Sequence, residues 1–299
     1  MVKKALIIGS GVTGLTVARH LSQAGMQIEI IDKGYKLGGR LATRAKQGYQ
    51  FDHGTPALET ADGFEDAVAS EVLVRTDHHA WFGQPEMRSL CGYLAQGFSV
   101  TQGCEIEAVE MCNHQLVVRL KDCGETDLFD AVVCTAPAPQ AAQLLAAFEE
   151  LAELARQADY APQWTCMLGF DTGFEGLSEQ VMMTTDHPVL ARLLFEHKKP
   201  GRPSLPAVTL HATTPWSFDH LEQSPEQALA AMSAACSEIL GLSLPTPAYA
   251  AAHRWRYARC IQTAGAVKGA IASQAAVAVA GDWVSKPDIA GGLASAQVA

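Results

Sequence analysis

Six residues near the start of the chain carry glycines at a spacing that can hold a diphosphate. Gly9, Gly11 and Gly14 form the pattern GxGxxG directly after the apolar residues 5–8. The first glycine permits a tight turn, the second lets backbone approach a pyrophosphate, and the third lets a helix pack close to a strand. The helix N-terminus then offers unpaired N–H groups and the positive end of its dipole to the anion. The pattern predicts a dinucleotide site.

An acidic residue follows at a position suited to a ribose. Asp32 closes the second apolar run, residues 28–31, where a carboxylate can accept hydrogen bonds from both ribose hydroxyls and would repel a 2′-phosphate. Between the two runs, Leu15, Ala18 and Leu21 keep helical spacing, and Gly25 falls at a helix end. This context favours a strand–helix–strand unit with a bound nucleotide over a glycine turn that binds nothing.

A second glycine cluster, residues 35–44, refines the nature of the nucleotide. Gly38 and Gly39 can let backbone pass against a ligand, while Arg40 and Arg44 supply positive charge. The cluster resembles an element of flavoproteins of the glutathione-reductase and amine-oxidase type, which NAD dehydrogenases do not need. The resemblance implies FAD in preference to NAD. The alternative is a solvated basic loop.

Composition narrows the choice of partners. The chain has 299 residues, 48% hydrophobic and 18% charged, with a formal net charge of −10, which argues against nucleic acid or an anionic membrane as partner. No apolar stretch has membrane-spanning length, and residues 1–4 run into the first strand without a leader, so we expect a cytoplasmic protein. Eight scattered cysteines contain no CxxC pair, so we expect neither a metal site nor a disulfide framework.

The apolar patterns further along the chain predict the remaining elements. Strands are expected at residues 105–110, 115–120, 128–134, 165–170, 207–212 and 275–280, and helices at residues 140–157, at residues 225–240 after Ser224, and from Gly291 onward. The last strand returns to the first sheet and is followed by Gly281 and Asp282, which can bind the flavin side of the cofactor. In the alternative interpretation Asp282 is only a turn or cap residue.

These elements predict an α/β fold with two domains. We expect a discontinuous, Rossmann-like FAD-binding domain of residues 1–60, 98–157 and 262–299. A mainly antiparallel α+β substrate domain would comprise residues 61–97 and 158–261. The expected cofactor-binding residues are Gly9, Ser10, Gly11, Val12, Thr13, Gly14, Asp32, Lys33, Gly39, Arg40, Leu41, Asp52, His53, Gly54, Thr55, Ile106, Thr135, Pro137, Gly281, Asp282, Gly291, Gly292 and Leu293.

Three segments of the expected substrate domain carry a narrower resemblance. Residues 160–164 (YAPQW), 211–217 (HATTPWS, followed by HLE at 220–222) and 253–258 (HRWRYA) are similar to segments of the small, renalase-like bacterial branch of the flavin-dependent amine-oxidase superfamily. The chain departs from that branch at Pro215, where an acidic residue usually precedes the tryptophan, and at His53, where a small or apolar residue is commoner.

The resemblance implies an oxidase of dihydro isomers of NAD(P), which passes electrons to O2 and releases H2O2. In such a donor the ring nitrogen lone pair expels the hydride, so no strong base is needed, and we name no catalytic residue. The candidates for the substrate pocket are His211, Trp216, Arg254, Trp255, Arg256 and Tyr257. In a strand, Arg254 and Arg256 share one face while Trp255 and Tyr257 share the other, so only one set can line a pocket.

Other functions remain open at this point. An amine oxidase or a desaturase-like flavoenzyme acting on another small molecule would use the same cofactor motifs. A flavin-binding sensor or scaffold without turnover is a third hypothesis, and an NAD dehydrogenase is disfavoured by the second glycine cluster. For each candidate of the substrate pocket, the alternative is a purely structural role in the core or on the surface. The expected partners are therefore a small reduced donor and O2, with no nucleic acid and no membrane.

Overall fold

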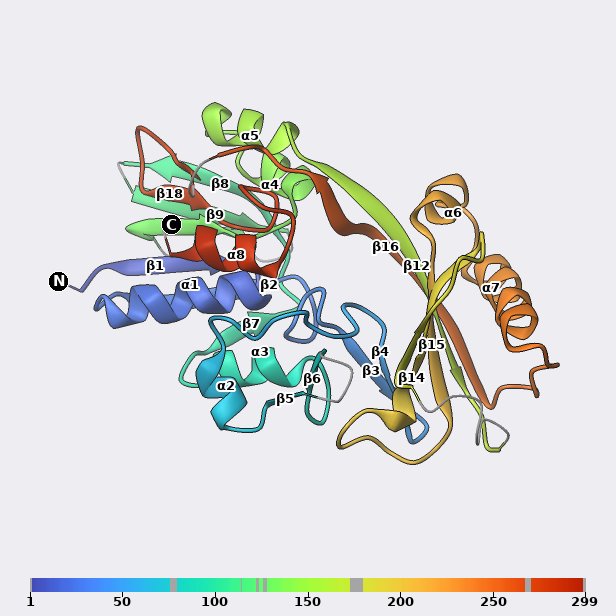
Figure 1. Ribbon diagram of the computed structural model, residues 1–299. Coiled ribbons are helices and arrows are strands. Elements are labelled where there is room, and N and C mark those ends of the chain that lie inside the picture. The colour runs from blue at the N-terminus through green and yellow to red at the C-terminus, as the bar shows by residue number, and fades with distance from the viewer. Residues whose placement is uncertain are drawn as a thin grey trace. The chain divides into compact units, whose positions relative to one another are not determined.

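The computed structural model describes residues 2–75, 80–113, 115–121, 124–125, 128–172, 180–266 and 270–297 (Figure 1). The chain forms two compact units. The first contains Met1–Gly39, Leu90–Tyr160 and Cys260–Ala299, and the second contains Arg40–Ser89 and Ala161–Arg259. Compared with the predicted division, residues 40–60 cluster with the second unit, and residues 90–97, 158–160 and 260–261 cluster with the first.

The first unit is built on a six-stranded sheet. Its order is β17 (Ala270–Ile271), β18 (Val277–Val279), β11 (Ala131–Cys134), β1 (Lys4–Ile8), β2 (Gln27–Asp32) and β7 (Val100–Gln102). All neighbours pair in parallel except β17 with β18. The predicted return of the last strand to the first sheet is confirmed, because β18 pairs with β11, which pairs with β1.

Both faces of this sheet are covered. On one face α1 (Val12–Gln23) packs against β1, β2 and β11, and α8 (Ile289–Ala296) lies beside α1 (Figure 1). On the other face lie α4 (Ala138–Leu144), α5 (Glu149–Arg156) and a small sheet of β8 (Ile106–Cys112), β9 (Gln115–Leu120) and β10 (Gly124–Glu125). Leu6 and Ile8 of β1 point to this second face and join its core with Val118 and Phe129. Helix α3 (Ser89–Leu94) falls mostly in the same unit.

The second unit is built on a five-stranded sheet. Its order is β13 (Met182–Thr184), β14 (Leu190–Phe195), β15 (Ala207–Ala212), β12 (Asp159–Gly169) and β16 (Tyr249–Gln262). Antiparallel pairing joins β13 to β14, β14 to β15, and β15 to β12. The α/β fold with a mainly antiparallel second part is therefore confirmed.

Residues on the two sides of this sheet pack against different elements. Val208, Leu210 and Ala212 share a core with α7 (Pro225–Leu240), while Ala207 packs with Tyr49 from the hairpin of β3 (Thr43–Lys46) and β4 (Tyr49–Asp52). Figure 1 shows α7 and this hairpin on opposite sides of the strands. The remaining elements are α2 (Glu65–Ala69), β5 (Leu73–Arg75), β6 (Trp81–Gly83), a 3₁₀ turn at Glu196–Lys198 and α6 (Thr214–Asp219).

Local signals explain the bounds of α7. The Ser224 hydroxyl accepts a hydrogen bond from the Gln227 N–H, and the Ser224 N–H donates to the Gln227 side-chain oxygen, which together form a capping box. Pro225 occupies the first helical position. Gly241 ends the helix in the left-handed conformation. The prediction for residues 225–240 is confirmed.

One predicted helix is wrong. Residues 140–157 form two helices, α4 and α5, because the chain turns after Leu145 and restarts at Phe148. Leu145, Phe148 and Leu151 are all buried in the core of the first unit, and the break lets all three face it. The connection between the predicted strands at residues 105–110 and 115–120 includes His114, which lies outside the described residues.

Candidate functional site

The glycine turn between β1 and α1 leaves space in front of the helix. Gly9 has φ = +107°, and its N–H donates to the Ile31 carbonyl at 2.9 Å. A Cβ on Gly14 would strike the Gly9 carbonyl oxygen, so only glycine allows this close packing. A Cβ on Gly11 would meet no atom within 4 Å. Gly11 is also the N-cap residue and has no side chain to accept a hydrogen bond from the first turn of α1.

Asp32 lies beside this turn. Its Oδ2 accepts hydrogen bonds from the N–H and the hydroxyl of Ser10, both at 2.6 Å, and its Oδ1 accepts from the Gly34 N–H at 2.7 Å. These bonds orient the half-buried carboxylate next to the open space. Because the Ser10 hydroxyl can rotate away, the carboxylate can accept hydrogen bonds from a ligand diol.

Residues 282–292 pack against the N-terminal end of α1. A Cβ on Gly292 would lie 2.6 Å from the Thr13 hydroxyl and 3.7 Å from the Asp282 N–H nitrogen. Asp288 caps α8 by accepting from the Gly291 N–H at 2.6 Å. Asp282 is 8% exposed and accepts from the Tyr160 hydroxyl at 3.2 Å. The N-terminal ends of α1 and α8 therefore lie together, although their sequences stand near opposite ends of the chain.

The other predicted cofactor residues of the first unit have varied surroundings. Gly39 has φ = +50°, and a Cβ there would lie 3.6 Å from the Gly11 Cα, so the second glycine cluster begins beside the first. The Thr135 hydroxyl donates to the Ile8 carbonyl at 2.8 Å, and Pro137 caps α4. Ile106 is buried in the core, and Lys33 is exposed. Leu293 is half-buried in α8, and Gly281 donates to Ser295.

These residues fit a dinucleotide diphosphate. The cradle combines a glycine-lined space, a helix N-terminus without a side-chain cap and an adjacent oriented carboxylate, which are the parts that such a ligand requires.

In the second unit, predicted cofactor residues are held by backbone contacts. The Thr55 N–H donates to the Arg40 carbonyl at 2.7 Å, and a Cβ on Gly54 would strike the same carbonyl. The Arg40 guanidinium donates to the Ala258 carbonyl at 3.3 Å, and Leu41 is buried. Their contacts with a cofactor stay predictions.

Asp52 belongs to a buried ion cluster, which we define as Asp52, Glu196, Lys199 and Arg202. Lys199 Nζ lies 3.0 Å from Asp52 Oδ2 and 2.8 Å from Glu196 Oε2, and Arg202 contacts both carboxylates. Burial alone would raise the pKa of Asp52, but the charges of Lys199 and Arg202 outweigh it and hold that pKa below its ordinary value. Sequence analysis missed the cluster because three of its members come from residues 196–202, far from Asp52 in sequence.

A histidine layer, comprising His53, His211, His253 and Trp255, lies on the side of the sheet that faces β4. The His53 ring stacks on Trp255, with centroids 5.4 Å apart, and meets the edge of His253 at 5.0 Å. Trp255 Nε1 donates to the His53 carbonyl at 2.8 Å. Burial lowers the pKa of His53 and of His211 to about 3, and that of His253 to about 4, so all three are neutral at pH 7.

The structure separates the other pocket candidates from this layer. Arg254 and Arg256 both bind Glu222, at 3.0 Å and 2.7 Å, on the opposite face of β16. Trp216 stacks on His220, with centroids 4.4 Å apart, and packs with the α7 core. Of the pocket candidates, His211 and Trp255 therefore lie in one layer, together with His253, which was not among the predicted pocket residues. Tyr257 is half-buried on the face of Trp255.

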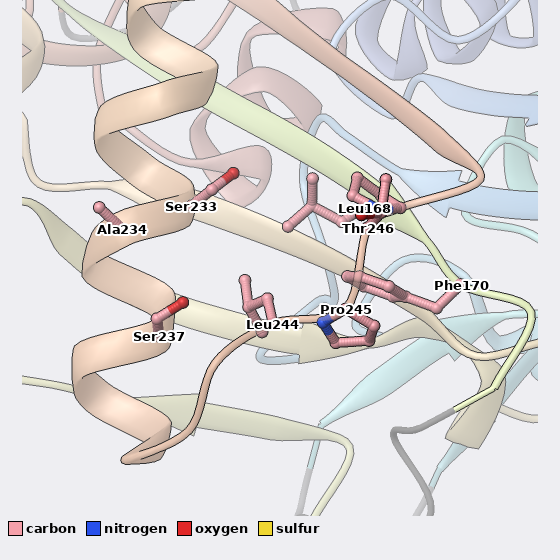
Figure 2. A pocket seen from close by; sticks show the side chains of 9 residues that line it. Leu168, Phe170, Ser233, Ala234, Ser237, Leu244, Pro245 and Thr246 are labelled. Carbon is pink, nitrogen blue, oxygen red and sulfur yellow. The ribbon is translucent and has the colours of Figure 1, made fainter.

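A cavity of about 310 Å³ lies on the α7 side of this sheet (Figure 2). Figure 2 shows Ser233 and Ser237 of α7 facing Leu168 of β12 and Phe170, which follows that strand, with Leu244 between them. None of the predicted site residues lines it. In the described part of the chain, no helix is long and apolar enough to cross a membrane, and no cluster of His, Cys, Asp and Glu is arranged for a metal ion.

Comparison with protein families gives two matches. The model for NAD(P)-binding Rossmann-like domains matches residues 7–71, and the model for flavin containing amine oxidoreductases matches residues 69–285. Among solved structures, a provisionally assigned protoporphyrinogen oxidase from Exiguobacterium sp. 255-15 superposes with a TM-score of 0.78 at 15% identity, covering 99% of this chain and 97% of its own. Putrescine oxidase superposes with a TM-score of 0.74 at 10% identity, covering 100% and 98%. These likenesses show the fold.

Two curated desaturases match the chain over a short segment. A 1-hydroxycarotenoid 3,4-desaturase from Flavobacterium sp. is 45% identical over 58 residues, which is 19% of this chain and 12% of that protein. A 4,4'-diapophytoene desaturase from Staphylococcus aureus is 35% identical over 67 residues, 22% of this chain and 13% of the relative. The matched segments span about an eighth of the relatives' length.

Proposed function

Because this chain belongs to the family of flavin-containing amine oxidoreductases, we propose that it is an oxidase of small reduced donors of the renalase-like kind. Dihydro isomers of NAD(P) are the proposed donors. The donor loses a hydride, which carries two electrons and one proton, and becomes aromatic. Together with one further proton from solvent, these reduce O2 to H2O2.

The protein is an FAD-dependent oxidoreductase. FAD, when bound, supplies a two-electron acceptor at its N5 atom that O2 can reoxidise. We propose that the glycine turn and the α1 N-terminus hold the pyrophosphate and that Asp32 binds the adenosine ribose. The adjoining α8 end, with Asp282 and Gly292, would bind the part of the cofactor that leads to the flavin.

The observation that carries the donor proposal is the arrangement of the three renalase-like segments. They lie on the adjacent strands β12, β15 and β16 and on α6, which follows β15. Two of them bring the neutral imidazoles of His211 and His253 and the Trp255 ring into one layer with His53. Flat rings can pack against a planar donor. A dihydropyridine needs no base, since its own nitrogen lone pair drives hydride loss, and the neutral layer agrees with that chemistry.

Anaerobic mixing of the FAD-loaded protein with each dihydro-NAD(P) isomer tests this function. We expect at least one isomer to bleach the flavin absorbance near 450 nm on the order of seconds or faster, as for typical enzyme turnover. Air should then restore the absorbance with one H2O2 formed per donor consumed. An unchanged flavin spectrum with every isomer would refute the proposed donor.

A second candidate is an amine oxidase or desaturase-like enzyme, favoured by the family match to amine oxidoreductases. A panel of primary and secondary amines mixed with the protein under the same anaerobic conditions distinguishes it. Rapid bleaching by an amine, together with no response to the dihydronicotinamides, would select this candidate.

A further inference from the structure

Two buried imidazoles of the histidine layer have no hydrogen-bond partner among the described residues. His53 Nδ1 and His211 Nε2 are both fully buried and unpaired, in side chains whose residues are 6% and 2% exposed. Buried polar atoms in folded proteins are nearly always paired with protein, ligand or ordered water. Two such atoms in one layer therefore indicate that something polar binds there.

Contacts across adjacent strands place both imidazoles in the same layer. Thr165 of β12 lies opposite His211 of β15, and the Thr165 hydroxyl donates to the His253 carbonyl of β16 at 3.4 Å. The His253 ring is in turn 5.0 Å from the His53 ring. Thr165 and His253 thus connect His211 to His53 through successive contacts on the β4 side of the sheet.

Two arginines lie near this layer, and neither forms an ion pair with an acidic side chain in the described part of the chain. Arg192 lies opposite His211 on β14 and is exposed, and Arg44 of β3 contacts the Tyr249 hydroxyl at 3.5 Å. Burial is the main cause of the lowered pKa values of these histidines. The charge of Arg44 lowers the pKa of His53 and His253 further, and that of Arg192 does so for His211, while Asp52 acts in the opposite direction on His53. Each neutral imidazole can present one N–H as a donor, and positive charge on the neighbouring arginines attracts an anion.

We infer that the histidine layer binds an anionic oxygen group of the substrate, a carboxylate or a phosphate, through His53, His211 and Arg192. The inference rests on the proposed function only in taking the second unit as the substrate-binding part. It separates the candidate donors by charge, because a dihydronicotinamide nucleotide carries phosphate, an amine carries a cation, and a carotenoid hydrocarbon carries neither.

Four small aromatic probes that differ in one group test the inference without any turnover. Benzoate, phenyl phosphate, benzamide and benzylamine are titrated into the FAD-loaded protein, and binding is followed by tryptophan fluorescence and by the flavin absorption spectrum. We expect benzoate or phenyl phosphate to bind at least ten-fold more tightly than benzamide, and benzylamine to bind most weakly. The better of the two anions identifies the source of the oxygen group.

Variants then assign the binding to the layer. Arg192→Gln changes an exposed side chain and should fold normally, yet weaken the anionic probe about ten- to hundred-fold. Arg192→Lys should recover part of the loss, and His211→Leu should weaken the probe similarly. Arg119→Gln, at a surface arginine of β9 paired with Glu110, is the matched control and should bind like the unmodified protein.

Equal binding of all four probes, tightest binding of benzylamine, or no binding of either anion would overturn the inference; in the last case ordered water fills the layer. These outcomes are separate from those of the donor experiment. Oxidation of a dihydronicotinamide with no preference for anionic probes would refute only the inference. Selective binding of benzoate with no donor oxidised would refute only the proposed donor.

Discussion

At the scale of single residues, glycines in the first unit differ in what they make possible. Gly14 is required by the protein itself, since a side chain there would strike the Gly9 carbonyl. Gly11 faces empty space, so the protein alone does not require it. At the N-terminus of α1 this open side is informative, because it is the side on which an anionic ligand can approach the helix end.

Gly11→Ala should therefore separate binding from folding. We expect a stability loss of no more than about 1 kcal/mol, because alanine is a poorer N-cap than glycine, together with a loss of FAD affinity of about ten-fold or more from the methyl group in the ligand space. FAD affinity is measured by flavin fluorescence titration of the cofactor-free protein. Gly92→Ala is the control: it also meets no atom within 4 Å, lies exposed in α3, and should leave FAD affinity unchanged. Equal FAD affinity in both variants would contradict a ligand at Gly11.

Lys199→Met should be strongly destabilising. It removes one of two cations that face two buried carboxylates in the ion cluster, and breaking a buried pair in this way costs about 3–5 kcal/mol. Urea unfolding at pH 7 measures the loss. Lys121→Met, at an exposed ion pair with Glu105, is the matched control and should change stability by less than about 1 kcal/mol. A loss as small as that of the control would show that the cluster contributes little.

At the scale of elements, sequence patterns predicted those segments whose signals are local. The strand–turn–helix of residues 4–23 and helix α7 follow from glycines, caps and apolar spacing that stand within a few residues of one another. The split between α4 and α5 could not be predicted, because it depends on which core Phe148 enters. The ion cluster and the contact of His53 with Trp255 also arise from packing between residues far apart in sequence. Neither produces a sequence motif with a fixed spacing.

Ser224→Ala tests the local signal that begins α7. The change removes the acceptor for the Gln227 N–H and should cost about 1 kcal/mol, as is typical for loss of an N-cap. Ser233→Ala makes the same substitution within the same helix, where alanine is the better helix former, and should be neutral or slightly stabilising. Thermal unfolding of both variants provides the comparison, and equal effects would contradict a capping role.

At the scale of the whole molecule, the histidine layer makes stability depend on pH. His53, His211 and His253 have folded pKa values of about 3, 3 and 4, against about 6.5 when unfolded. Between these values the unfolded state binds more protons, so stability is fully present above about pH 6.5 and is lost as the pH falls toward 4. Three protons correspond to a slope of roughly 4 kcal/mol per pH unit near pH 5.

Urea unfolding at pH 5, 6 and 7 measures this dependence. His253→Phe removes one of the three protons and should lower the slope near pH 5 by about a third. Phe218→Leu exchanges one exposed side chain without a titratable group for another, serves as the control and should leave the slope unchanged. A free energy of unfolding that stays constant from pH 7 to pH 5 would show that the three imidazoles take up protons in the folded protein as readily as in the unfolded protein.

The parallel sheet of the first unit also sets an order of assembly during synthesis. β1 and α1 leave the ribosome well before β18 and α8, which are added to the sheet and pack against Thr13. A nascent chain can therefore form the glycine turn early but lacks the second helix end that stands beside it. We therefore expect the proposed nucleotide site to close only after β18 and α8 have left the ribosome, and a chain stalled before β18 would expose the unpaired edge of β11 to aggregation.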